Sequence, residues 1–299
     1  MTAKRKRRAS NSFPFYLLIP AFLLLGIFVF YPVARVFGYS TWHYTALRPK
    51  ETAFVGLGNF ATILQYDLFY LSLKNSMIYA ATTTVVQFLL GLWLALLLRH
   101  MKTGSGLYRT LVFAPWALSG VLTSIIWQMV FNGSFGILND ILLRLGLIKE
   151  AVVWTATPRL AMMCVIVATI WRGIPYFGIS LLGAMLSIPN DLYESASIDG
   201  ANGIKCFFNI TLPYIKETVV LTTILRFIWT FNDVDIIHSF TGGGPNNGTL
   251  TLPIYITRET LTHLNFGYGS ALTVILTLVL LVLTSIYLGA MKTSDDFAA

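Results

Sequence analysis

Two arginines lie inside long apolar stretches of this sequence, where a charged side chain needs a specific partner. An ionised group inside a lipid bilayer costs a few kcal/mol unless it faces a partner or a wet cavity. Helical spacing aligns each arginine with polar neighbours in two stripes: Thr169, Arg172, Tyr176 and Ser180, and Thr222, Arg226, Thr230 and Asp233. The stripes predict the lining of a passage.

A purely structural interpretation of the same arginines stays open beside the passage. In it, Arg226 pairs with Asp233, about two helical turns further along the chain. Arg172 extends its long side chain toward the membrane surface instead of facing a pathway. The sequence does not decide between the two interpretations.

Residue patterns of the common enzyme and metal sites are missing from the sequence. His43 has no spaced ligand partner, and Cys164 and Cys206 are expected in different environments, so neither a metal site nor a disulfide is predicted. No G-x-x-x-x-G-K-[ST] segment occurs, which predicts that this chain does not bind ATP itself. We therefore expect a protein that is not an enzyme and holds no cofactor.

The composition is that of an integral membrane protein. Of 299 residues, 56% are hydrophobic and only 11% are charged, with a mean hydropathy of +0.69, whereas soluble domains carry about 25% charged residues. A spanning helix needs roughly 20 apolar residues. Six stretches qualify, which predicts an all-α fold: Phe13–Phe37, Ser72–Leu98, Tyr108–Phe131, Leu160–Leu186, Tyr214–Ile236 and Gly267–Met291.

Lysines and arginines set the expected orientation. The net charge of +8 comes largely from the run Lys4–Arg8, which next to an apolar stretch favours anionic lipid over nucleic acid. With that run in the cytoplasm, the basic turn at 99–107 also faces the cytoplasm. We expect a cytoplasmic N-terminus (1–12), an uncleaved membrane domain (13–291) and a short cytoplasmic tail (292–299).

The segments between the spans carry further local signals. Pro115 is expected to kink the third span, because proline removes one helical hydrogen bond. Residues 137–145 have the spacing of a short amphipathic helix on the outer membrane surface. The glycines and proline of 241–245 predict a flexible turn.

A polar island separates the fourth and fifth spans, at residues 187–213. Asp191 is expected to cap a short helix, Gly200 or Gly203 to take the positive φ that ends it, and Pro213 to begin the next helix. The segment therefore predicts a cytoplasmic helix, a turn and a new helix.

This island resembles the E-A-A-x-x-x-G loop of ABC-importer permeases, with I-x-L-P downstream. The matching residues are Glu194, Ala196, Gly200, Ile210, Leu212 and Pro213. Ser195 replaces the first alanine, a change from one small residue to another. In that family the loop docks on the ATPase subunit, whereas the alternative is an ordinary connector between two membrane helices.

Four further segments resemble the permeases of sugar importers, in the same order along the chain. They are F-V-G-L-G-N-F at 54–60, R-T-L-V-F-A-P-W at 109–116, T-G-G-G-P at 241–245 and F-G-Y-G-S-A-L at 266–272. The resemblance covers residues 14–290 and includes the maltose and glycerol-3-phosphate permeases. It implies the type I importer-permease fold, with six transmembrane helices.

The resemblance also implies partners and sites. The expected partners are a second permease, two ATPase subunits that hold ATP and Mg²⁺, and an extracytoplasmic sugar-binding protein. The coupling residues would be Glu194, Ser195, Ala196, Asp199, Gly200, Leu212 and Pro213. Substrate would pass Trp171, Arg172, Tyr176, Arg226, Trp229, Thr230 and Asp233. The binding protein would touch Thr241, Gly242, Gly243, Gly244 and Pro245.

Three alternatives to sugar import remain at this point. Two arginines would also suit a phosphorylated polyol such as glycerol 3-phosphate. An ion-coupled secondary transporter is disfavoured, because acidic residues are absent from the middles of the six spans. A membrane-embedded enzyme lacks the residues for catalysis. The expected location is a bacterial or archaeal cell membrane.

Overall fold

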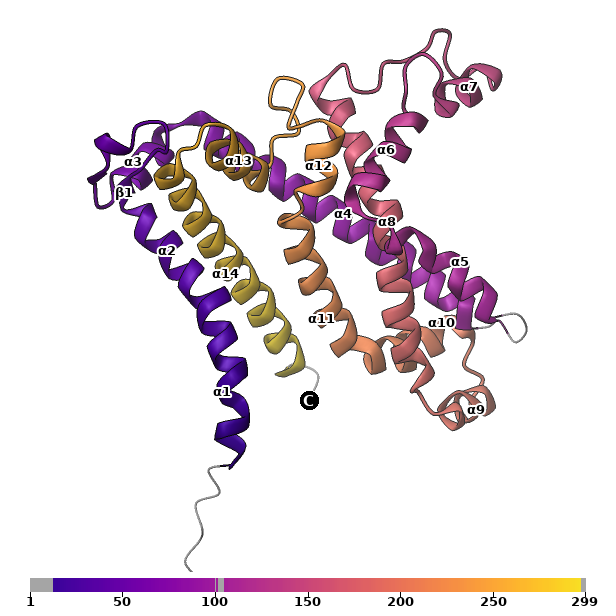
Figure 1. Ribbon diagram of the computed structural model, residues 1–299. Coiled ribbons are helices and arrows are strands. Elements are labelled where there is room, and N and C mark those ends of the chain that lie inside the picture. The colour runs from indigo at the N-terminus through magenta and orange to yellow at the C-terminus, as the bar shows by residue number, and fades with distance from the viewer. Residues whose placement is uncertain (1–12, 100, 102–104, 297–299) are drawn as a thin grey trace, which may run out of the picture. The chain divides into compact units, whose positions relative to one another are not determined.

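The computed structural model describes residues 13–99, 101 and 105–296 of the chain. These divide into two compact units. Unit 1 consists of the described residues within Met1–Ile63 and Glu259–Ile275. Unit 2 consists of those within Leu64–Arg258 and Leu276–Ala299. Figure 1 labels the α-helices and strand β1.

Unit 1 begins with one long apolar helix that is interrupted by a wide turn. Residues Tyr16–Ser40 form a candidate span of 25 residues. The elements of this part of the chain, beginning with the three that make up this helix, are α1 Phe13–Leu25, the π-turn η1 Gly26–Phe30, α2 Tyr31–Ser40, β1 Trp42–His43, the 3₁₀ turn η2 Pro49–Glu51, β2 Ala53–Phe54 and α3 Gly58–Gln65.

A small antiparallel hairpin follows α2. Trp42 pairs with Phe54 and His43 pairs with Ala53. Asn59 fastens it by donating to the carbonyls of Ser40 at 2.8 Å and Trp42 at 2.9 Å. The hairpin was not predicted, because two residues per strand are too few for an alternating pattern to show.

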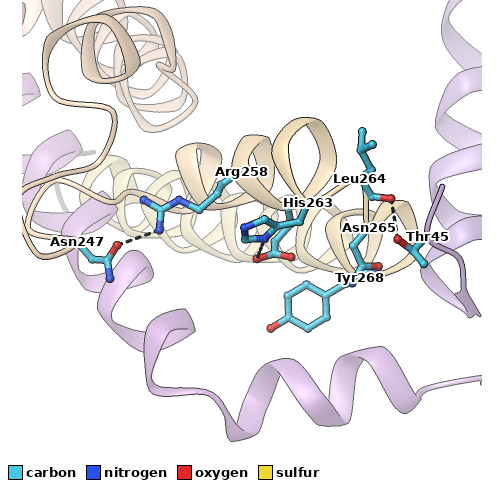
Figure 2. Close-up of polar contacts among 8 residues, drawn as sticks. Thr45, Asn247, Arg258, His263, Leu264, Asn265 and Tyr268 are labelled. Atoms are coloured by element: carbon cyan, nitrogen blue, oxygen red, sulfur yellow. Dashed lines mark hydrogen bonds and ion pairs between the residues drawn. The ribbon is translucent and has the colours of Figure 1, made fainter. Parts of the chain in front are cut away.

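The second segment of unit 1 runs from the π-turn η4 (Arg258–Thr262) into α14 (Phe266–Asp296). The Thr45 hydroxyl donates to the Leu264 carbonyl at 3.2 Å, a contact drawn in Figure 2. The Tyr44 ring stacks between Tyr39 and Phe266. These contacts join the 38–63 region to the beginning of α14.

The regular elements in the described part of unit 2 are all helical. Besides the part of α14 from Leu276 on, they are α4 Asp67–Arg99, α5 Ser105–Ala117, α6 Gly120–Val130, α7 Ile137–Arg144, α8 Pro158–Leu186, α9 Asn190–Ile198, α10 Gly203–Cys206, the π-turn η3 Phe207–Thr211, α11 Leu212–Phe231, α12 Asp235–Phe240 and α13 Leu252–Thr257.

The core of unit 2 lies where α4, α8 and α11 meet. A Cβ built at Gly91 of α4 would overlap Phe177 of α8, so glycine permits the close approach of these helices. Phe177 is also part of a buried cluster, whose members are Ala95, Leu98, Phe177, Leu181, Leu182, Met185, Ile188 and Ile215. Burial of these side chains fixes the three helices against one another.

Within the described part of the chain, four helices are long and apolar enough to cross a membrane, or five if one bent pair counts as a span. They include α4, α8 and residues 266–291 of α14. The expected fifth span corresponds to α11, which falls outside this apolar class because it contains Lys216, Glu217 and Arg226. The prediction of six stretches therefore included one that is more polar than the rest.

The expected third span is broken, a larger change than the kink predicted at Pro115. Thr110–Ala117 and Gly120–Val130 meet at 100°. Ser119 caps α6 by accepting from the backbone N–H of Leu122 at 3.2 Å. The cap gives α6 its own N-terminus, so the chain turns here instead of bending gradually.

The beginning of α11 agrees with the prediction, because Pro213 lies in its first turn. A helical run that was not predicted leads into it from Gly203, where Asn202 caps α10 by accepting from the Lys205 N–H at 2.9 Å. The π-turn η3 then leads directly into Leu212 and Pro213. Its wider hydrogen-bond spacing accommodates a residue that has no N–H to donate.

Candidate functional site

The 187–213 hairpin presents α9 to solvent at its tip. Glu194, Ser195, Asp199 and Gly200 are exposed, and Ala196 is half-buried. Leu212 and Pro213 begin α11 at the other end of the hairpin. The structure therefore places five of the seven predicted coupling residues on or directly after one short helix, and the other two at the base of the hairpin.

Gly200 ends α9 in the left-handed conformation, as predicted, with φ of +74°. The N–H of Gly200 reaches the Ser197 carbonyl at 3.1 Å, and the N–H of Ala201 reaches the Ala196 carbonyl at 2.9 Å. This pair of bonds is a Schellman cap, which favours glycine at this position. The predicted cap at the other end is wrong, because Pro189 occupies the N-cap and Asp191 lies within the first turn.

Apolar side chains surround this tip without being covered. Ile198 is 86% exposed and Ile204 is 70% exposed. The acidic residues Asp191, Glu194 and Asp199 of the same segment are also exposed. An exposed apolar patch with a polar rim is typical of a protein interface.

A polar cavity of about 400 Å³ lies in unit 2, between the broken span and the end of α11. Its lining includes five of the seven predicted pathway residues: Arg172, Arg226, Trp229, Thr230 and Asp233. Four more lining residues were not predicted: Trp116, Asn232, Val234 and Asp235. Trp116 and Asp235 belong to segments that helical spacing alone does not align with the two stripes.

Arg226 is held by an amide from another helix. Its Nε donates to Gln87 Oε1 at 2.7 Å, and Gln87 Nε2 donates to the Thr169 carbonyl at 2.6 Å. Gln87 is fully buried. A Cβ at Gly173 would overlap both Gln87 and Arg226, so glycine leaves the room that this pair needs.

The purely structural interpretation expected Arg226 to pair with Asp233 and Arg172 to extend to the membrane surface, but both arginines have other partners. Among the residues that the structure describes, no ion pair joins Arg226 to Asp233. Asp233 Oδ2 instead accepts from the Tyr79 hydroxyl at 3.4 Å, and Tyr79 also contacts the Thr169 hydroxyl at 2.9 Å. Arg172 Nε donates to the Leu118 carbonyl at 3.1 Å, at the break between α5 and α6, instead of extending to the membrane surface.

The predicted aromatic residues divide between the cavity and the packing around it. Trp229 lines the cavity and contacts the Tyr176 ring edge-on at 5.5 Å. The Arg226 guanidinium lies 5.9 Å from the centre of the Tyr176 ring. Trp171 is not a lining residue, since it packs against Trp127.

The Thr241–Pro245 loop is a closely bonded turn, in contrast to the flexible turn expected. Thr249 contacts the Thr241 hydroxyl at 2.6 Å and donates to the Gly244 carbonyl at 2.8 Å. Gly242 and Gly243 have φ of +60° and +93°, which explains their glycines. Arg258 donates to Asn247 at 2.9 Å (Figure 2).

Comparison with known proteins gives the family. The profile described as "Binding-protein-dependent transport system inner membrane component" matches residues 87–294. The chain belongs to this family. The relation confirms the expected role as the membrane permease of such an importer.

Curated relatives agree over nearly their whole length. The sulfoquinovosyl glycerol permease of Agrobacterium fabrum is 33% identical, over 93% of this chain and 90% of that protein. The trehalose/maltose permease of Thermococcus litoralis is 31% identical over 96% of each. The sn-glycerol-3-phosphate permease of Agrobacterium fabrum is 32% identical over 91% and 92%.

A solved structure confirms the fold. A chain of a bacterial ABC transporter that imports alginate aligns with a TM-score of 0.81 at 22% identity, over 94% of this chain and 96% of that one. The type I importer-permease fold expected from the resemblance is therefore present.

Proposed function

We propose that this permease passes a sugar across the cell membrane in an importer driven by ATP. The observation that carries the proposal is the 187–213 hairpin, whose exposed helix ends in a glycine cap and carries Ile198 at its tip. The named relatives carry sulfoquinovosyl glycerol or trehalose and maltose, which favours a glycoside as the substrate here.

Energy would enter through α9. Glu194 and Asp199 would pair with basic groups on an ATPase subunit, and Ile198 would fill an apolar depression between them. The same hairpin continues into α8 and α11, so a displacement of α9 moves the helices that line the cavity. ATP and Mg²⁺ would belong to the two ATPase partners.

Substrate would contact the unit 2 cavity. The exposed ring of Trp229 offers a face for a sugar ring, and the Asp233 and Asp235 carboxylates offer acceptors for hydroxyl groups. Arg172 and Arg226 of the same lining supply donors. Trp171 is left out of this set because its ring is engaged with Trp127.

The extracytoplasmic partner would dock at the Thr241–Pro245 loop. This loop borders a hollow of about 730 Å³ together with Gln128, Phe131 and the 132–134 turn. A fixed turn beside a hollow loses little conformational entropy when it binds. A second permease would complete the assembly, with both termini of this chain in the cytoplasm.

Reconstituted uptake tests the proposal. The complex of both permeases and the ATPase would be placed in liposomes with a radiolabelled sugar and the loaded binding protein. We expect uptake with ATP, and none with ADP or with an ion gradient alone. Gradient-driven uptake without ATP would contradict the proposal.

A phosphorylated polyol is the second candidate substrate. Two arginines in the cavity and the glycerol-3-phosphate relative favour it. Asp233 and Asp235 in the same lining balance that charge, so a neutral glycoside remains first. Competition of labelled sugar uptake by sn-glycerol 3-phosphate separates the two.

A further inference from the structure

The side chain of Tyr193 joins the coupling helix to the body of unit 2. Along α9 only Tyr193 and Ala196 are half-buried, and the other residues from Asn190 to Ile198 are exposed. Tyr193 packs against the buried cluster that includes Leu98 of α4, Met185 of α8 and Ile215 of α11. Its ring therefore lies where those three helices meet.

Polar contacts of Tyr193 reach the end of α4 and the end of the π-turn η3, directly before α11. The Arg99 guanidinium, at the end of α4, lies 4.3 Å from the centre of the Tyr193 ring, and Arg99 Nη1 donates to the Tyr193 hydroxyl at 2.9 Å. The Tyr193 hydroxyl also lies 2.8 Å from the Thr211 hydroxyl. Cation–π and charged hydrogen-bond contacts act here on the same ring.

These groups form one continuous set of hydrogen bonds. Arginine can only donate, so the Tyr193 oxygen accepts from Arg99, and either the Tyr193 or the Thr211 hydroxyl donates in the bond between them. The Thr211 hydroxyl also donates to the Cys206 carbonyl at 3.5 Å. Thr211 is buried and ends the π-turn η3, directly before α11. Tyr193 thus contacts the end of α4 and the start of α11 together.

These are the two helices that carry the Gln87–Arg226 pair beside the cavity. We propose that Tyr193 is the positioning residue that transmits displacement of α9 to α4 and α11. The inference rests on the proposed coupling role of the hairpin and adds a side-chain route to the connection through the backbone. Without Tyr193, α9 would still dock, but its movement would reach the cavity only through its chain ends.

The test uses three variants in the reconstituted complex. Tyr193→Phe keeps the ring and removes the hydroxyl, Tyr193→Ala removes both, and Thr211→Val removes the Thr211 hydroxyl that faces Tyr193. Tyr214→Phe is the matched control, because Tyr214 is exposed. A photo-cross-linking residue at Ser195 reports docking on the ATPase.

We expect ATP-driven uptake to fall about tenfold in Tyr193→Ala and about threefold in Tyr193→Phe and Thr211→Val, given the size of such hydrogen-bond contributions. ATP hydrolysis and the Ser195 cross-link should persist. The double variant Tyr193→Phe with Thr211→Val should lose less than the product of the two single losses, because both changes remove the Tyr193–Thr211 bond.

The outcomes separate this inference from the proposed function. Absence of the Ser195 cross-link in the unaltered complex would remove the coupling role itself. A persistent cross-link with normal uptake in Tyr193→Phe and Thr211→Val would overturn the transmission role alone. Loss of the cross-link in Tyr193→Phe would show that Tyr193 only shapes the docking surface. If Tyr193→Ala fails to reach the membrane, the two conservative variants decide.

Discussion

Positions 200 and 173 both require glycine, but for different physical reasons. Gly200 has open space around its α-carbon and needs its positive φ, whereas Gly173 has no such φ and needs the space that Gln87 and Arg226 fill. The sequence predicted the first, because a glycine after a short acidic helix is a recognisable cap. It could not predict the second, because the contact joins residues on three separate helices.

Gly200→Ala is expected to strain the hairpin by about 1 kcal/mol, since an L-residue is disfavoured in the left-handed region. The tip would change shape, and ATP hydrolysis would continue with reduced uptake. Gly203→Ala is the matched control, because Gly203 also has open space but no positive φ. Equal uptake in the two variants, measured in liposomes, would contradict this reading of Gly200.

Gly173→Ala is expected to separate Gln87 from Arg226. A hydrogen bond to a charged group contributes roughly 1.5–3 kcal/mol, so the melting temperature in detergent should fall and uptake should drop at least about tenfold. Gly183→Ala on the same helix meets nothing within 4 Å and should leave both unchanged. A Gly173→Ala protein with normal uptake would show that the pair has no role in transport.

At the scale of whole elements, caps decide where helices end more than proline does. Pro115 suggested a kink, but the Ser119 cap and the 100° turn make two helices. Pro213 does lie in the first turn of α11, but the Asn202 cap begins the helical run that leads into it. Apolar length predicted the long helices correctly. Caps and π-turns depend on one or two polar residues, which are too common in loops to identify from sequence.

The Thr241–Pro245 loop carries an element-scale prediction about docking. In Gly243→Ala, the new Cβ would lie 3.1 Å from both Arg258 Nη2 and Leu250 Cδ1 and would disturb the turn. We expect the dissociation constant for the loaded binding protein to rise at least about fivefold. Gly146→Ala controls for strain alone, since Gly146 has a φ of +69° and open surroundings. An unchanged dissociation constant in Gly243→Ala would show that the Thr241–Pro245 loop does not take part in docking the binding protein.

For the whole molecule, the account requires the 187–213 hairpin to face the cytoplasm. Composition predicted the membrane class, and the lysine and arginine distribution predicted the orientation. The charged residues of α11 made one of the predicted spans less apolar than the others. The family relation nevertheless identifies the chain as an importer permease. Orientation is the expectation on which coupling, substrate direction and partner positions all depend.

Thiol labelling tests that expectation most directly. Ile198→Cys would be made together with Cys206→Ser, because Ile198 is far more exposed than the half-buried Cys206, and the buried Cys164 can remain. A maleimide that cannot cross lipid would be applied to intact cells and to inverted membrane vesicles. The account predicts labelling of position 198 in the vesicles and none in intact cells. Labelling in intact cells would place the hairpin outside and contradict the account.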